Sequence, residues 1–235
     1  MFLLANRASR LTEKMDMADC HPDRLARTYR HFALINTAVS GWSVLYRRYL
    51  RPALAASDRP ARILDIGCGG GDVLRRLTLR ARRDGFSVTA LGIDPDDRAV
   101  AVACQSNTPP GIDFRVTDAR SLAQTGERFT IVLSNHVLHH LPEESVPGFL
   151  ETSRQLSTGL VLHNDIRRHI LAYLGFPLIG GLFHDSYILT DGLRSIRRSF
   201  TPNELRAIVP PGWEVRTAHP FRCVVIGAAG TGETV

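Results

Sequence analysis

The chain has 235 residues, of which 44% are hydrophobic and 22% are charged, so it is neither a disordered chain nor a disulfide-dependent mini-protein. Its length fits one α/β domain with added segments and is too short for two independent enzymes. Lysine and arginine outnumber aspartate and glutamate by 29 to 23, giving a formal charge of +6. No basic block is interleaved with aromatic residues, which argues against a nucleic-acid-binding protein.

Several features favour an intracellular location. The four cysteines form no CxxC pair, which fits a reduced compartment. The apolar run Met1–Ala5 is too short for the core of a signal peptide. The longest later apolar stretch, Ile170–Phe183, is interrupted by glycines and a proline and falls short of the ~20 residues of a spanning helix. We therefore expect a cytoplasmic protein without a transmembrane segment, and we leave open both peripheral membrane contact and oligomerisation.

The N-terminal region, residues 1–57, is expected to form a helical cap. Apolar residues recur at close to helical spacing from Leu25 to Val39. The sequence Asp58-Arg59-Pro60 then breaks this pattern and separates the cap from the region that follows.

Short apolar strands alternate with helices over residues 58–165. The expected strands span 61–66, 87–93, 113–116, 129–134 and 159–164, and the expected helices begin at Asp72, follow Pro95 and cover 143–156. Short buried strands that alternate with helices are typical of a parallel sheet with helices on both faces. This region is therefore predicted to form an α/β core.

The pattern changes after the fifth strand. Residues 166–208 are predicted to form a lid insert, which ends in a short helix with Thr201 at its N-cap and Glu204 in the capping-box position. Two further strands, 213–217 and 221–227, complete the sheet within the C-terminal segment 209–235. Because the insert leaves the sheet at the edge where α/β folds bind ligands, we expect it to cover an acceptor pocket.

A glycine-rich loop follows the first strand, with the sequence Asp65-Ile-Gly67-Cys-Gly69-Gly-Gly71. Glycines permit positive φ and a close approach of the backbone to a ligand. A dinucleotide fingerprint, GxGxxG, would need glycine at position 72, where this chain has an aspartate that would repel a pyrophosphate. The loop is therefore expected to face a neutral or zwitterionic group rather than NAD or FAD.

This loop resembles motif I of the class I S-adenosylmethionine-dependent methyltransferases. The resemblance implies a Rossmann-like seven-stranded sheet, S-adenosylmethionine as cofactor and S-adenosylhomocysteine as product. It also implies that Asp94 accepts the ribose hydroxyls, that Asp118 and Ala119 contact adenine, and that the fourth strand ends beneath the methionine part. The implied cofactor-binding residues are Asp65, Gly67, Gly69, Gly71, Asp94, Pro95, Asp118, Ala119, Asn135 and His136.

Two narrower resemblances concern the flanking segments. The run Phe32, Asn36, Ser40-Gly41-Trp42 and Arg47-Arg48 is similar to the segment before motif I in ubiquinone and menaquinone methyltransferases. The stretches Asp191–Ser195 and Arg198–Leu205 are similar to the insert of methyltransferases associated with type III polyketide synthases. The first places the chain near quinone and phenol methyltransferases, and neither decides which atom is methylated.

Candidate catalytic residues follow the fourth and fifth strands. A phenol benefits from a nearby base, and His139 or His140, at the start of a helix, is expected to be that base, or else to cap the helix or line the cofactor pocket. Asp165 either orients an acceptor hydroxyl or caps the next helix. His136, His139 and His140 have the spacing of a metal cluster, but no carboxylate or cysteine nearby completes a set, so no metal is expected.

The sequence therefore predicts methyl transfer from S-adenosylmethionine to a small, largely apolar acceptor, aromatic or lipid-like, at the hydroxyl of a phenolic, polyketide or quinol-like compound. One alternative is C-methylation of a quinol-like ring. Another is a non-catalytic cofactor-binding subunit of a synthase complex, although an intact glycine loop argues against it. No nucleic-acid partner is expected, since positions 135–138 read Asn-His-Val-Leu rather than the Asn-Pro-Pro-Tyr of enzymes that methylate amino groups of nucleic acids.

Overall fold

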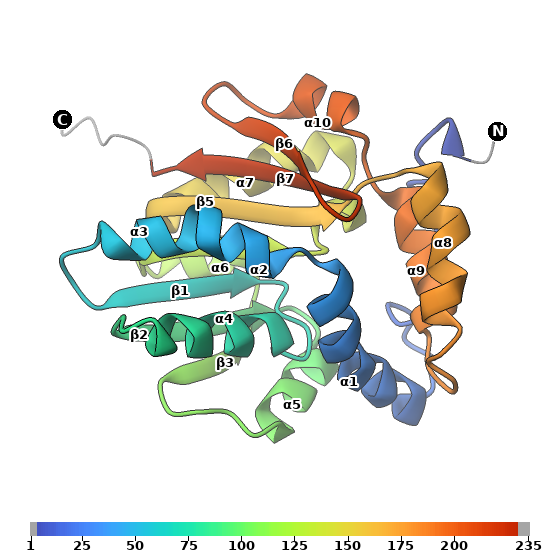
Figure 1. Cartoon of the computed structure of the whole chain (residues 1–235), viewed down its shortest axis with the longest axis horizontal. Coiled ribbons are helices and arrows are strands. Elements are labelled where there is room, and N and C mark those ends of the chain that lie inside the picture. Colours follow the sequence, from blue (N-terminus) through green and yellow to red (C-terminus); the bar gives the residue numbers. More distant parts are fainter. Residues whose placement is uncertain (1–3, 230–235) are drawn as a thin grey trace.

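Seven strands form one sheet at the centre of the computed structural model, which describes residues 4–229 (Figure 1). The strands are β1 (Ala61–Ile66), β2 (Val88–Asp94), β3 (Ile112–Val116), β4 (Phe129–Asn135), β5 (Ser157–Ile166), β6 (Glu214–Ala218) and β7 (Arg222–Ala228). Their order in the sheet is β3-β2-β1-β4-β5-β7-β6. The first five strands pair in parallel, whereas β7 is antiparallel to both β5 and β6. The expected seven-stranded sheet is confirmed, and β7 makes it mixed.

Helices and helical turns connect and flank the strands. They are α1 (Pro22–Val39), α2 (Trp42–Leu45), the π-helical η2 (Tyr46–Leu50), α3 (Arg51–Ala55), α4 (Asp72–Arg83), α5 (Asp97–Gln105), α6 (Ala119–Gln124), the 3-10 turns η3 (Leu138–His140) and η4 (Glu143–Ser145), α7 (Val146–Gln155), α8 (Ile170–Gly180), α9 (Ile188–Arg198) and α10 (Pro202–Ile208). The capping box expected at Thr201 and Glu204 opens α10. Within residues 4–229, no helix has the length and apolar character needed to cross a membrane.

The segment 4–21 contains no α-helix, so the expectation of a helical region up to residue 57 is wrong there. The first helix begins only at Pro22, whose fixed φ suits the first helical turn. Ahead of it, backbone groups bond to distant parts of the chain: the N–H groups of Lys14 and Met15 donate to the Asp191 carboxylate on α9, at 2.8 and 2.9 Å. Because these bonds replace helical ones, residues 4–21 pack against α9 without regular structure, and we call this segment the irregular strap.

Helices cover both faces of the sheet. Trp42 and Leu74 belong to the core that α2, η2, α3 and α4 form on one face. Leu150 and Leu205 belong to the core that α6, α7 and α10 form on the other face. Each of these side chains is almost inaccessible to solvent, and burying a leucine contributes about 1.5–3 kcal/mol. These two cores fix the strand ends that carry the site.

The strand order reverses between β1 and β4, because the chain passes from β1 to β2 and β3 on one side and to β4 and β5 on the other. In open α/β sheets a ligand crevice forms at the carboxyl ends of the strands at such a point. The helices α1, α8 and α9 lie beyond this edge, and α8 is the outermost of them (Figure 1). Residues that converge here come from the N-terminal, central and C-terminal parts of the chain.

Candidate functional site

The loop after β1 requires glycine at several positions. Gly67, Gly69 and Gly71 have φ of 69°, 53° and 74°, in the left-handed region that residues with a Cβ avoid. A Cβ at Gly67 would lie 2.5 Å from Cγ2 of Val137, and one at Gly71 would lie 2.5 Å from the ring of Phe114. The loop therefore makes a tight turn into α4, with Gly71 at the N-cap.

Two carboxylates flank this loop. Asp65 is 1% exposed, and its Oδ1 has no hydrogen-bond partner among the described residues. Burial, followed by the charges of Asp72 and Asp94, raises the pKa of Asp65 well above its ordinary value. Asp94 accepts the N–H of Gly69 at 2.9 Å on Oδ2 and that of Asp96 at 3.0 Å on Oδ1. An unpaired buried oxygen and the remaining lone pairs suit a ligand that carries donor groups.

A cavity of about 590 Å³ opens beside these groups, and we call it the glycine-loop cavity. Many of the residues expected at the site line its wall: Asp65, Gly67, Gly69, Asp94, Pro95, Asn135, His136 and His140. Gly71 does not line the wall, because it lies where α4 begins and packs against Phe114. The cavity thus joins the carboxyl ends of β1, β2 and β4.

Asp118 and Ala119 do not line the glycine-loop cavity. Asp118 is the N-cap of α6, where its carboxylate accepts the N–H of Ser121 at 2.9 Å and the hydroxyl of Ser121 at 3.1 Å. The backbone hydrogen bond from Ser121 is the main cause that lowers the pKa of Asp118. A contact of these two residues with adenine stays a prediction.

The helices before β1 reach the site through the residues singled out in the sequence. Phe32, on α1, lines the glycine-loop cavity. Asn36 donates a hydrogen bond from Nδ2 to Oδ2 of Asp72 at 3.1 Å, which ties α1 to the start of α4. Trp42 donates from Nε1 to Oδ1 of Asn135 at 3.0 Å. The N-terminal helices are therefore bound directly to the glycine loop and to the end of β4.

Arg222, the first residue of β7, was not among the residues expected at the site. Its guanidinium is buried and donates to Oδ1 of Asn164 at 3.0 Å, to Nε2 of His136 at 2.8 Å and to Oδ1 of Asn135 at 3.2 Å. Burial lowers the pKa of Arg222 to about 10, so it remains charged at neutral pH. One cation thus holds the ends of β4 and β5 together at the crevice.

His136 has φ of 64°, a left-handed conformation that is uncommon outside glycine. Burial, and then the charge of Arg222, lower its pKa well below the ordinary value, so the ring is neutral. Because Nε2 accepts from Arg222, the proton of the neutral ring is assigned to Nδ1. His136 therefore offers a donor rather than a base.

A second cavity, of about 270 Å³, lies beyond His136 between α1, α8 and α9, and we call it the apolar cavity. Its wall is mostly apolar and includes Ile35, Phe176 and Ile188. Phe32 and His136 line both this cavity and the glycine-loop cavity. The two cavities therefore adjoin at these residues.

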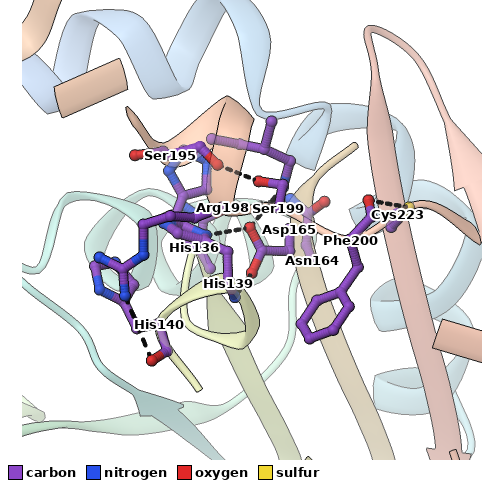
Figure 2. Close-up of polar contacts among 12 residues, drawn as sticks. His136, His139, His140, Asn164, Asp165, Ser195, Arg198, Ser199, Phe200 and Cys223 are labelled. Carbon is purple, nitrogen blue, oxygen red and sulfur yellow. Dashed lines mark hydrogen bonds and ion pairs between the residues drawn. The ribbon is translucent and has the colours of Figure 1, made fainter. Parts of the chain in front are cut away.

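His139 lies at the wall of the apolar cavity, with its ring beside the carboxylate of Asp165 (Figure 2). Its Nδ1 is 2.6 Å from Oδ1 of Asp165, and its backbone N–H donates to Oδ2 at 2.8 Å. Its Nε2 is 3.2 Å from Oε1 of Glu13. Burial alone would lower the pKa of His139, but Asp165 and Glu13 outweigh burial and raise it to about 9. Asp165 is buried within β5 and orients the histidine; it caps no helix.

Glu13 comes from the irregular strap and was not expected at the site. Its Oε1 accepts the hydroxyl hydrogen of Ser195, on α9, at 2.7 Å. Burial would raise the pKa of Glu13, but the close contact with His139 and the charges of His140 and His139 outweigh it and lower the pKa to about 2. Glu13 is therefore an anion at neutral pH.

His140 is 31% exposed, against 1% for His139. Both residues lie at the end of the turn η3, so the expectation that they start a helix is wrong. Possible metal-ligand atoms of Glu13, His139 and His140 lie within 4.8 Å of one another. Glu13 therefore adds a carboxylate to this group, which could not be found near the histidines in the sequence. Nη1 of Arg198 already lies 3.7 Å from Oε1 of Glu13 and places a positive charge there. We assign no metal to this cluster.

A glycine loop at the reversal of strand order, acidic groups at the strand ends and an adjoining apolar cavity define a class I S-adenosylmethionine-dependent methyltransferase. A family model described as a methyltransferase domain matches residues 42–209. The chain belongs to this family, and the class expected from the glycine loop is confirmed.

Curated relatives carry the name ubiquinone biosynthesis O-methyltransferase. The protein of Brucella anthropi is 32% identical over 155 residues, which are 64% of this chain and 58% of that protein. The protein of Rhizobium etli is 36% identical over 123 residues, which are 49% of this chain and 46% of that protein. The chain thus spans about half the length of these relatives.

Solved structures of similar fold are also methyltransferases. The plantazolicin methyltransferase BpumL, in complex with a triazolic desmethylPZN analog and SAH, matches with a TM-score of 0.59 at 13% identity, over 88% of this chain and 95% of that one. A TehB-like SAM-dependent methyltransferase from Corynebacterium glutamicum matches with a TM-score of 0.50 at 17% identity, over 88% of this chain and 96% of that one. At these identities the likeness shows the fold alone.

Proposed function

We propose that this chain transfers the methyl group of S-adenosylmethionine to the oxygen of a small, largely apolar aromatic hydroxyl compound. The observation that carries the proposal is that Phe32 and His136 line both the glycine-loop cavity and the apolar cavity. Methyl transfer is an in-line displacement, so donor and acceptor must approach from opposite sides of one opening. The names of the curated relatives support oxygen as the acceptor atom.

The glycine-loop cavity fits S-adenosylmethionine by its donor and acceptor groups. The unpaired buried Oδ1 of Asp65 suits an ammonium group. Each oxygen of Asp94 accepts one N–H bond and keeps a lone pair for a ribose hydroxyl. The positive φ of Gly67 and Gly69 and their lack of a Cβ allow a close approach of the loop. When bound, the sulfonium group supplies an electrophilic methyl group.

The apolar cavity fits an aromatic or alkylated acceptor. Apolar side chains dominate its wall, and polar groups enter it at a few points, which is the usual character of a small-molecule site. The Nδ1–H assigned to His136 is a donor for the acceptor oxygen at the opening between the cavities. The acceptor hydroxyl would thus be oriented where the two cavities adjoin.

His139 is the proposed base. In O-methylation the sulfur–methyl bond of the donor breaks as the O–CH₃ bond forms, and the acceptor oxygen must lose its proton to a base. Nδ1 of His139 is engaged by Asp165, so Nε2 takes the proton and Asp165 stabilises the imidazolium. Glu13 occupies the position beside Nε2 and must yield it to the acceptor hydroxyl. Loss of this contact lowers the pKa of His139 from about 9 and makes the neutral ring available.

Calorimetric titration with S-adenosylhomocysteine, with NADH as the control, tests the cofactor. Binding of the first and not of the second is expected, and the reverse result would overturn the proposal. A panel of phenolic lipids and polyketides is then incubated with S-adenosylmethionine labelled with ¹³C in its methyl group. The carbon chemical shift of the product shows whether the label is on oxygen, as expected, or on a ring carbon, which would replace O-methylation by C-methylation.

A further inference from the structure

Helix α8 is apolar on all sides, although it lies on the outside of the molecule (Figure 1). Its eleven residues include no charged side chain. A helix of this composition is normally buried in a core or a membrane. Here six large apolar side chains of α8 and of the turn after it are between 38% and 80% exposed, namely Ile170, Leu171, Leu174, Leu178, Ile179 and Leu182. A contiguous exposed apolar surface of this kind marks a docking site.

Arginines lie at both ends of this helix. Arg167 precedes it in the chain. Arg24 and Arg27, on α1, donate hydrogen bonds to backbone carbonyl groups of the turn that follows α8. The charged residues of α1 and of the two segments that flank α8 are Arg24, Arg27, Arg30, Arg167, Arg168, Asp23 and Asp185, of which Arg168 is buried. Arginine is in excess, so the rim of the apolar surface complements an anionic partner.

We propose that α8 docks this protein on an anionic membrane surface, with its leucines among the acyl chains and the arginines at the phosphate groups. An eleven-residue helix is about 16 Å long and cannot cross a hydrocarbon core of about 30 Å, but it can lie in the plane of the interface. Apolar contact and attraction to anionic headgroups then act together.

The docking surface adjoins the apolar cavity. Leu171 and Ile179 are exposed and also line that cavity, and Ala172, Gly175 and Phe176 line it from the same helix. An apolar acceptor dissolved in the bilayer would therefore reach the cavity along α8 without crossing water. This route rests on the proposed function, whereas the docking itself rests on the exposed surface alone.

Flotation of the full chain with vesicles tests the docking. The vesicles contain phosphatidylcholine, either alone or mixed with phosphatidylglycerol. The protein is expected to float with the anionic vesicles, and less so as salt is added, because salt screens the arginines. The double variant Leu174→Glu, Leu178→Glu is expected to lower partitioning about tenfold or more, since it places charges in the apolar surface. The variant Leu79→Glu, which alters an exposed leucine on α4, is the matched control and keeps binding.

S-adenosylhomocysteine titration of the same variants shows that they are folded and separates the two proposals. A wild-type chain that floats but does not bind this ligand would contradict the proposed function and leave the docking intact. The docking is overturned by absent flotation, by equal flotation with neutral and anionic vesicles, or by unchanged flotation of the double variant. It is also overturned if sedimentation velocity shows a dimer that the double variant dissociates, because a second copy would then cover α8.

Discussion

Oε1 of Glu13 lies 3.2 Å from Nε2 of His139, although Glu13 belongs to the irregular strap and His139 to the turn after β4. With Asp165 on Nδ1, the imidazole is held between two buried carboxylates. An imidazolium between two carboxylates loses its proton less readily than a free imidazolium does, so its pKa is raised. The strap therefore acts on the acidity of the group that we propose as the base, and it does so from outside the sheet.

The variant Glu13→Gln is expected to shift the pH dependence of kcat/KM to lower pH. The variant removes a negative charge beside Nε2, so the pKa of His139 falls from about 9 toward the ordinary value of about 6.5. The neutral base is then present at lower pH. Rates measured from about pH 6 to pH 10 locate the inflection in each protein. Glu144→Gln, at an exposed glutamate, is the control, and coincident profiles of wild type and Glu13→Gln would exclude an effect of Glu13 on the base.

Substitution of the two adjacent histidines is expected to separate catalysis from binding. His139→Gln should lower kcat by about 10²–10⁴, the usual contribution of a general base, and leave the affinity for S-adenosylhomocysteine unchanged. His140→Gln should have the smaller effect on kcat, because His140 is partly exposed and lines the glycine-loop cavity. Turnover and calorimetry on both variants provide the comparison. A larger loss of kcat in His140→Gln would reassign the base.

Asp94→Ala is expected to weaken binding of S-adenosylhomocysteine by about 10- to 100-fold. Hydrogen bonds to a charged group contribute about 1.5–3 kcal/mol, and the variant also removes the carboxylate that holds the Gly69 N–H. Calorimetry gives the dissociation constants. Asp97→Ala, three positions along the chain and exposed, should bind as the wild type does. Unchanged affinity in Asp94→Ala would show that Asp94 does not bind the ribose.

Gly67→Ala and Gly148→Ala are expected to change stability in opposite directions. At Gly67 the new Cβ would lie 2.5 Å from Cγ2 of Val137 at φ of 69°, which should cost about 1–3 kcal/mol. At Gly148, inside α7, a Cβ meets nothing within 4 Å, and alanine should stabilise the helix by about 0.5–1 kcal/mol. Urea denaturation measures both. Equal stability of the two variants would mean that the loop tolerates a side chain.

The wall of the glycine-loop cavity could be predicted because most of its residues are local in sequence. The residues Asp65, Gly67 and Gly69 lie within one strand–loop–helix turn, and Asp94 ends the neighbouring strand. Parallel strands bring such ends to one edge, so strand order alone places them together. For the same reason Asn135, at the end of β4, could be expected at the wall of this cavity.

Glu13 and Arg222 could not be found in this way. Glu13 is a single acid in a segment without regular structure, and only its tertiary contacts bring it to His139. Arg222 is a charged residue at the start of an otherwise apolar strand, which by itself is a weak signal in the sequence. Its role in a buried hydrogen-bond network becomes clear only when the neighbours of β7 are known. Asp118 is the N-cap of α6, and because an N-cap and a ligand contact can use the same residue type at a strand end, the sequence alone does not separate these two roles.

The position of β7 has a consequence for biosynthesis. This strand follows β6 in the chain but inserts between β5 and β6, and its first residue is the cation that joins Asn135, His136 and Asn164. A nascent chain that has emerged from the ribosome only as far as β5 would already contain the glycine loop and the carboxylates of Asp65 and Asp94 beside it. It would lack the strand that locks the opening between the two cavities. A methyl-transfer site that depends on Arg222 would therefore be completed only after β7 has been synthesised and has paired with β5.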